Sequence, residues 1–154
     1  MDPRSAAHVL QQIAAHLELR GESSFKSRAY EQAASALLGL DTDDLAPLLR
    51  DGTLAATRGL GPATLSVVRE LVDTGESSYL EQLRATTPTG LLELLRVPGL
   101  STAKIHKLHA ELGVDSIESL EAAARDGRVA ALPRYGPKTA DKILKGIAFL
   151  RSAG

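Results

Sequence analysis

The chain has 154 residues and a net charge of −1, and its composition is 44% hydrophobic but only 3% aromatic. A core that contains few aromatic side chains must be built from Leu, Ala, Val and Ile, and this favours helices over sheet. The chain has no cysteine, which excludes disulfides, thiolate zinc sites and a cysteine nucleophile.

The first half of the chain shows helical periodicity from its start. Asp2 is expected to cap a first helix that begins at Pro3 and ends at Gly21. A second helix is predicted over residues 24–38, and its core-facing residues are expected to be Phe25, Ala29, Ala33, Ala36 and Leu37.

Shorter helices are predicted next. One follows the acidic run Asp41-Thr42-Asp43-Asp44 and ends at Asp51-Gly52, and another runs from Pro62 to about Asp73. A further helix begins at Ser78, which forms a capping box with Glu81.

The second half repeats this alternation of short and longer helices. Helices are expected over residues 88–96 and, after the next turn, up to about Leu112. Asp115, with Glu118, is expected to cap a helix that ends near Gly127, and a last helix is expected up to about Leu150. No stretch alternates with period two, so no strand is predicted. We therefore expect an all-α protein of two small helical domains, over residues 1–84 and 85–154.

An internal repeat is the most informative feature. Three times a short helix, a tight turn and a longer helix are predicted in succession, in the segments TRGLGPATLSVVREL, VPGLSTAKIHKLHAEL and LPRYGPKTADKILKGI. An apolar residue stands in the middle of each turn: Leu60, Leu100 and Tyr135. The repeat predicts three helix-hairpin-helix motifs, one in the first domain and two in the second.

Such a turn is suited to binding a phosphate group. The start of a helix offers unpaired backbone N–H groups and a partial positive charge, and glycines let the backbone approach an anion closely. These contacts position a protein on DNA without reading its sequence. The predicted contacts are Gly59, Leu60, Gly61, Ala63 and Thr64 in the first hairpin; Gly99, Leu100, Ser101, Ala103, Lys104 and Lys107 in the second; and Arg134, Tyr135, Gly136, Lys138, Thr139 and Lys142 in the third.

The charge distribution favours the second half as the DNA-binding part. Residues 1–100 carry 9 basic and 13 acidic side chains, whereas residues 101–154 carry 9 basic and 6 acidic ones. Local charge matters more than the total, because salt screens exposed charges beyond about 10 Å.

The same residues allow simpler interpretations. The glycines could simply close αα-hairpins, with the lysines solvated, although three turns at one spacing favour phosphate binding. The carboxylates of residues 41–44 suit the first turn of a helix without any metal, and no third ligand accompanies His106 and His109. No catalytic constellation is found.

The stretches LELRGESSFKSRAYEQAASAL and DGTLAATRGLGPATLSVVREL resemble the N-terminal lyase-type domain of bacterial family X DNA polymerases. TPTGLLELLRVPGLSTAKIHKLHAELGV and LPRYGPKTADKILKGIAFLR are similar to the fingers-side helices of the same family. This resemblance implies binding to gapped DNA. It also implies a Na⁺ or K⁺ ion held by backbone carbonyls, which would be those of Thr57 and Leu60 and those of Val97 and Leu100.

The departures from that family concern its chemistry. The chain ends at Gly154, before the family's polymerase palm, so no polymerase activity is expected. The lyase amine would fall at Val67. Of the cluster that binds the 5′-phosphate, Lys26 matches and Arg28 adds a cation, whereas Phe25 and Ala63 depart from the pattern.

We therefore expect a cytoplasmic, nucleoid-associated protein that is not an enzyme and needs no other cofactor or membrane. Its expected partner is duplex, nicked or gapped DNA, bound without sequence preference in repair, recombination or nucleoid organisation. Three alternatives stay open: a protein–protein adaptor, a non-catalytic subunit or fragment that works with a catalytic protein, and an abasic-site lyase that uses Lys26.

Overall fold

The computed structural model describes residues 1–153, which form ten helices and no strand, as the sequence predicts for an all-α protein. Its contacts divide the chain into two compact units, Met1–Thr86 and Thr87–Gly154. None of the helices formed by residues 1–153 has the length and apolar character that crossing a bilayer requires.

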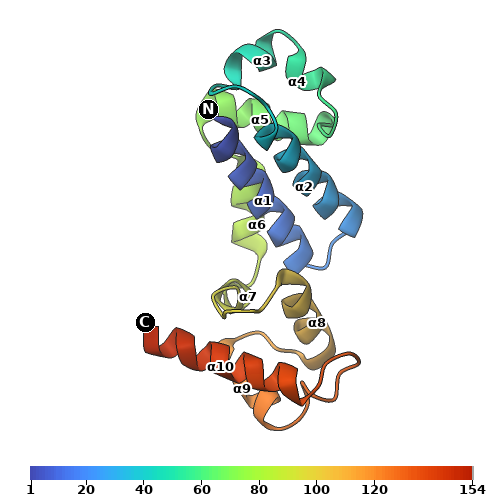
Figure 1. Ribbon diagram of the computed structural model, residues 1–154, viewed down its shortest axis with the longest axis vertical. Coiled ribbons are helices and arrows are strands. Elements are labelled where there is room, and N and C mark those ends of the chain that lie inside the picture. The colour runs from blue at the N-terminus through green and yellow to red at the C-terminus, as the bar shows by residue number, and fades with distance from the viewer. Residues whose placement is uncertain (154) are drawn as a thin grey trace. The chain divides into compact units, whose positions relative to one another are not determined.

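The first unit contains six helices. They are α1 (Pro3–Leu19), α2 (Ser24–Leu38), α3 (Ala46–Arg50), α4 (Thr53–Ala56), α5 (Pro62–Thr74) and α6 (Ser78–Thr86). The long helices α1 and α2 lie side by side (Figure 1). Asp2 caps α1 as predicted, because its carboxylate accepts the N–H of Ser5 at 3.0 Å. The short helix α4 is absent from the sequence-based prediction.

The prediction that Phe25 faces the core is wrong. Phe25 is 82% exposed, and α2 instead buries Ser27, Tyr30, Ala33, Ala34 and Leu37. The hydroxyl of Ser27 donates to the carbonyl of Ala14 in α1 at 3.2 Å, so this polar side chain is accommodated inside. With Ser27 and Tyr30 inward, the 3.6-residue period carries Phe25 to the solvent side.

Two predicted caps are displaced by one residue. At α6, the N–H of Leu80 bonds to the hydroxyl of Ser77 at 3.2 Å, whereas the N–H and hydroxyl of Ser78 both donate to Glu70. At α9, Ser116 rather than Asp115 is the N-cap. Neighbouring residues with similar side chains compete for a cap, and sequence spacing does not separate them.

The second unit contains four helices: α7 (Thr89–Leu94), α8 (Thr102–Leu112), α9 (Ile117–Arg125) and α10 (Pro137–Ala153). Its buried side chains include Leu94, Leu108, Leu120 and Ile147. Helix α10 lies along α9 (Figure 1), and Arg151 of α10 pairs with Glu121 of α9 at 2.9 Å.

A glycine lets α10 approach the turn before α8. A Cβ atom at Gly146 would lie 2.9 Å from the carbonyl oxygen of Pro98 and 3.0 Å from Cγ1 of Val97. Both contacts are closer than ordinary van der Waals packing. The absence of a side chain at Gly146 therefore allows α10 to lie this close to the second predicted hairpin.

Candidate nucleic-acid interface

The three predicted hairpin turns share one backbone hydrogen-bond pattern. The N–H of Leu60, Leu100 and Tyr135 donates to the carbonyl three residues earlier, of Thr57, Val97 and Leu132, at 3.2, 3.2 and 3.0 Å. The next residue in each turn then accepts the first helical hydrogen bond, from Leu65, Ile105 and Ala140. The repeat seen in the sequence is thus a repeat of main-chain geometry.

Each turn has one residue in the left-handed region, at its third position. The φ angles are +100° at Gly59, +81° at Gly99 and +67° at Arg134. Among residues 1–153, Arg134 is the one non-glycine residue with positive φ. A positive φ strains the backbone of a residue that has a side chain, whereas glycine adopts it without strain. The third turn therefore carries backbone strain at Arg134 that the other two turns avoid.

The turns differ in the number of backbone donors they leave open. In the first turn, the N–H of Gly61 is occupied by the buried hydroxyl of Thr64 at 2.9 Å, and Pro62 has no N–H. In the second turn, no acceptor within residues 1–153 takes the N–H of Ser101, Thr102 or Ala103. The second turn is therefore the better anion cradle.

In the third turn, Gly136, Lys138 and Thr139 likewise donate their N–H groups to no acceptor within residues 1–153. Pro137 begins the helix. The donors again point to an anion site at the start of a long helix.

Side chains at matching positions show how the hairpins differ in charge. Two residues after the helix-opening Gly61, Ser101 or Gly136 stand Ala63, Ala103 and Lys138. Three residues after it stand Thr64, Lys104 and Thr139, and six residues after it stand Val67, Lys107 and Lys142. The first hairpin carries no cation at any of these positions, and its Val67 is buried.

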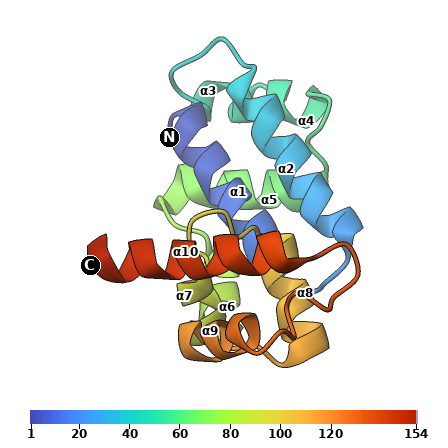
Figure 2. The same ribbon diagram turned by 60° about the horizontal axis from the view of Figure 1, so that its bottom comes forward.

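Lys107, a predicted contact of the second hairpin, also contacts the third turn. Its Nζ lies 3.5 Å from the carbonyl oxygen of Pro133 and 5.3 Å from the ring centroid of Tyr135. The loop between α9 and α10 returns past α8 to this contact (Figure 2). Lys107 therefore supports the third turn from α8 through a hydrogen bond and a cation–π contact.

Several basic side chains of the second unit are already paired with carboxylates. Lys145 pairs with Asp141 at 3.0 Å and Arg128 with Asp126 at 2.8 Å, while Arg125 and Arg151 share Glu121. Within residues 1–153, no carboxylate pairs with four exposed cations close to turns two and three: Lys104, Arg134, Lys138 and Lys142. These four cations stand at predicted site positions.

The first hairpin opens onto an uncharged groove. A hollow of about 380 Å³ is lined by Ala29 and Gln32 of α2 and by the turn from Gly59 to Thr64. The predicted cations Lys26 and Arg28 are exposed on α2 but do not line this hollow.

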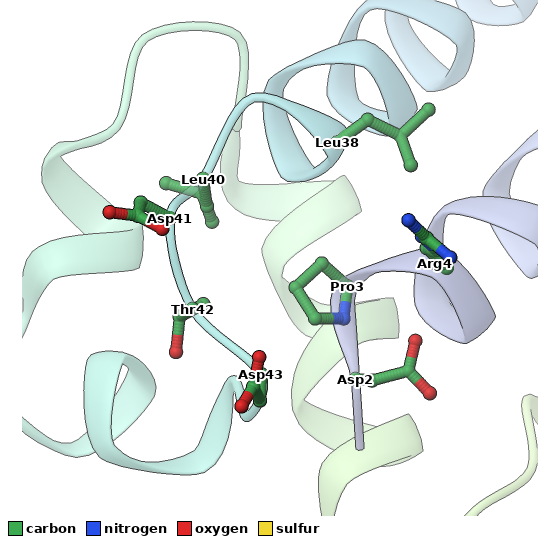
Figure 3. Close-up of a pocket in the computed structure, with 8 residues that line it drawn as sticks. All are labelled: Asp2, Pro3, Arg4, Leu38, Leu40, Asp41, Thr42 and Asp43. Atoms are coloured by element: carbon green, nitrogen blue, oxygen red, sulfur yellow. The ribbon is translucent and has the colours of Figure 1, made fainter.

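A second hollow of the first unit is acidic and was not predicted as a site. It measures about 570 Å³, and Figure 3 shows Asp2, Asp41 and Asp43 around it together with Arg4. The N–H of Ser5 holds the pKa of Asp2 below its usual value, so the carboxylate stays charged. This hollow repels a phosphate group.

Neither of the weak metal candidates forms a site among residues 1–153, where no group of three His, Cys, Asp or Glu side chains is arranged to hold a metal ion. The carboxylate of Asp44 accepts the N–H of Ala46, the first residue of α3, at 3.1 Å, and His109 Nδ1 bonds to the carbonyl of Val114 at 2.9 Å.

Sequence reasoning missed a small cavity in the second unit. It measures about 100 Å³ and is lined by Pro98, Gly99, Lys104, Thr139, Lys142 and Ile143. Gly146, in the middle of an otherwise favourable helix, was the available signal, because a glycine there indicates close approach of another segment.

Comparison with known proteins gives three matches. Residues 1–77 match the helix-hairpin-helix domain family, and residues 91–148 match the SAM-like helix-hairpin-helix tandem family. Over 147 residues, 96% of the chain, the sequence is 39% identical to the DNA polymerase/3′-5′ exonuclease PolX of Bacillus subtilis (strain 168). The chain spans 25% of that relative, and the match confirms the resemblance drawn from the sequence.

Proposed function

The chain belongs to the helix-hairpin-helix domain family, and we propose that it binds the phosphate backbone of DNA without regard to base sequence. One observation carries the proposal. Turns two and three combine open backbone N–H groups with unpaired cations, Lys104 in the second and Arg134, Lys138 and Lys142 in the third. The charge of each unit agrees: residues 1–86 are net −4 and residues 87–154 net +3.

The proposed target is duplex, nicked or gapped DNA met during repair, recombination or nucleoid organisation. The second unit carries most of the affinity, since the first hairpin lacks cations at the matching positions and uses the N–H of Gly61 internally. The first unit contributes through its exposed Lys26 and Arg28.

A monovalent cation is part of the proposal. The carbonyl oxygens of Leu60 and Leu100 accept no hydrogen bond from residues 1–153, and those of Thr57 and Val97 accept one each. Backbone carbonyls are the oxygen ligands that hard cations prefer. These residues fit a Na⁺ or K⁺ ion that would bridge the turn to a phosphate.

In this proposal the chain acts by binding DNA and catalyses no lyase reaction. Val67 is an apolar, buried residue at the position where the lyase reaction of the resembling family needs an amine. Borohydride treatment with an abasic DNA tests this: we expect no trapped adduct. An adduct that disappears in Lys26→Ala would establish a lyase instead.

A role beside a catalytic domain is the second candidate. It is favoured by the relative, which is a polymerase and exonuclease by name and of which this chain spans 25%. In that role the hairpins hold the DNA for chemistry performed by another domain or protein.

Fluorescence anisotropy with unrelated duplexes of equal length tests sequence-independent binding. We expect equal affinities, and a plot of log K against log salt with a slope of about −3 to −4 if roughly four phosphates are engaged. Nicked, gapped and single-stranded DNA in the same assay identify the preferred form. Binding that ignores salt, or that selects one sequence, would contradict the proposal.

A further inference from the structure

The small cavity of the second unit joins residues from two different hairpins. Pro98 and Gly99 belong to turn two and Lys104 to the helix after it, whereas Thr139, Lys142 and Ile143 belong to α10, which follows turn three. The close approach at Gly146 explains this arrangement. Thr139, Lys142 and Gly146 lie on one face of α10, at helical spacing, so a face that touches Pro98 also delivers Thr139 and Lys142 to turn two.

The groups around this cavity suit an anion. Its lining contains two lysines and no carboxylate. Neither Lys104 nor Lys142 has an ion-pair partner within residues 1–153, although Lys145, one turn beyond Lys142, forms an ion pair with Asp141. Two like charges beside one small cavity repel each other, and an anion between them removes that repulsion.

The cavity also offers hydrogen-bond donors and little space. The hydroxyl of Thr139 donates to no acceptor within residues 1–153, and the N–H of Gly99, which also lines the cavity, donates to none there either. A volume of about 100 Å³ holds about three water molecules. That space is sufficient for a phosphate group.

We propose that this cavity is a single phosphate-binding site shared by hairpins two and three, with Lys104 and Lys142 holding the same phosphate group. The inference rests on the proposed DNA binding and deepens it. Hairpins two and three do not each bind a separate phosphate through these two lysines. Lys142, which follows the third hairpin, instead binds at the second, and Arg134 and Lys138 are the cations that remain at the third turn.

Inorganic phosphate tests the cavity without DNA. In an NMR titration of the ¹⁵N-labelled chain, we expect saturable shifts of the Gly99 and Thr139 amides. Lys104→Gln and Lys142→Gln should each abolish them. Lys145→Gln, which removes the same charge from the same helix outside the cavity, should leave them unchanged. Absence of saturable shifts, or equal loss in Lys145→Gln, would overturn the shared site.

DNA titrations then separate this inference from the proposed function. Removing one shared phosphate contact should make the salt slope shallower by about one in the double variant of Lys104 and Lys142, whereas two separate contacts would remove about two. If the wild-type chain binds DNA and the salt slope of the double variant becomes shallower by about two, only the sharing of one phosphate by the two lysines is refuted. Wild-type chain that does not bind DNA refutes the proposed function, while the phosphate titration still reports on the cavity.

The source of the phosphate is resolved by the DNA ends. Equal affinity for 5′-hydroxyl and 5′-phosphate duplexes, weakened for both by Lys142→Gln but not by Lys145→Gln, assigns a backbone phosphodiester to the cavity. Tighter binding of the phosphorylated end, lost in Lys142→Gln but not in Lys145→Gln, assigns a terminal phosphate. Either result supports the site. Circular dichroism of each variant confirms that the fold is intact, which is expected because all three lysines are exposed.

Discussion

Gly146→Ala should destabilise the second unit, although helix propensity alone predicts the opposite. In a helix interior, alanine is more favourable than glycine by about 1 kcal/mol. At Gly146, however, the added methyl group would lie 2.9 Å from the carbonyl oxygen of Pro98 and 3.0 Å from Cγ1 of Val97. Overpacking of this kind costs about 1–3 kcal/mol.

The difference between these terms gives a net loss of unfolding free energy of about 1 kcal/mol. Gly146→Val brings a larger, β-branched side chain to the same contact and should lose about 3 kcal/mol. Urea unfolding followed by circular dichroism measures both values. Hydrogen exchange of the amides in α8 and α10 reports on the second unit by itself.

Ala148→Gly calibrates the propensity term. Ala148 is exposed on the same helix, so this variant should lose about 1 kcal/mol with no change in packing. If Gly146→Ala instead gains what Ala148→Gly loses, α10 does not press on turn two. The explanation of the shared cavity would then be wrong as well, because the same approach brings Lys142 to Gly99.

The remaining predictions concern the hairpins. The double variant Lys138→Glu with Lys142→Glu should bind DNA at least about tenfold more weakly in anisotropy titrations, a loss of about 1.4 kcal/mol, because it reverses two unpaired cations. Unchanged affinity would show that the cations of α10 do not contribute to the main site. Gly59→Val should lower the melting temperature clearly and the DNA affinity only slightly, since Gly59 has φ +100° and a Cβ there would lie 3.1 Å from that of Ala36. A folded variant that no longer binds DNA would contradict this. Arg134→Gly should stabilise the chain by about 1 kcal/mol, because it relieves the backbone strain of a residue at φ +67°, and it should weaken DNA binding because a positive charge is lost. Equal or lower stability in urea unfolding would show that the turn is unstrained.

Local signals predicted most of the helices and all three turns. Helix α2 begins at Ser24 and ends at Leu38 as expected, because a glycine stop and a regular apolar period agree there. The inward face of α2 was less predictable. The buried side chains of Ser27 and Tyr30 look polar in the sequence, and only the contact with Ala14 shows that α1 accommodates the serine.

The candidate site was predictable where it is local and missed where it is not. The spacing of Gly59, Gly99 and Arg134 in the repeat indicated three equivalent turns, and their hydrogen bonds agree. The different surroundings of Lys107 and Lys142 could not be predicted from the sequence. Both stand six residues after a helix start, yet one meets Tyr135 and the other lines a cavity beside Pro98. Which segments meet across the fold decides this, and sequence spacing does not encode it.

The main-chain pattern that the three turns have in common also bears on how such proteins change over time. Hydrogen bonds between backbone groups hold each turn, so the side chains around it are free to vary while the loop keeps its form. Ser101 and Arg134 stand at the positions that Gly61 and Gly59 occupy in the first turn, and the turns nevertheless make the same backbone hydrogen bonds. A lineage that duplicates this hairpin can therefore silence one copy and strengthen another by single substitutions, with no intermediate that has to refold.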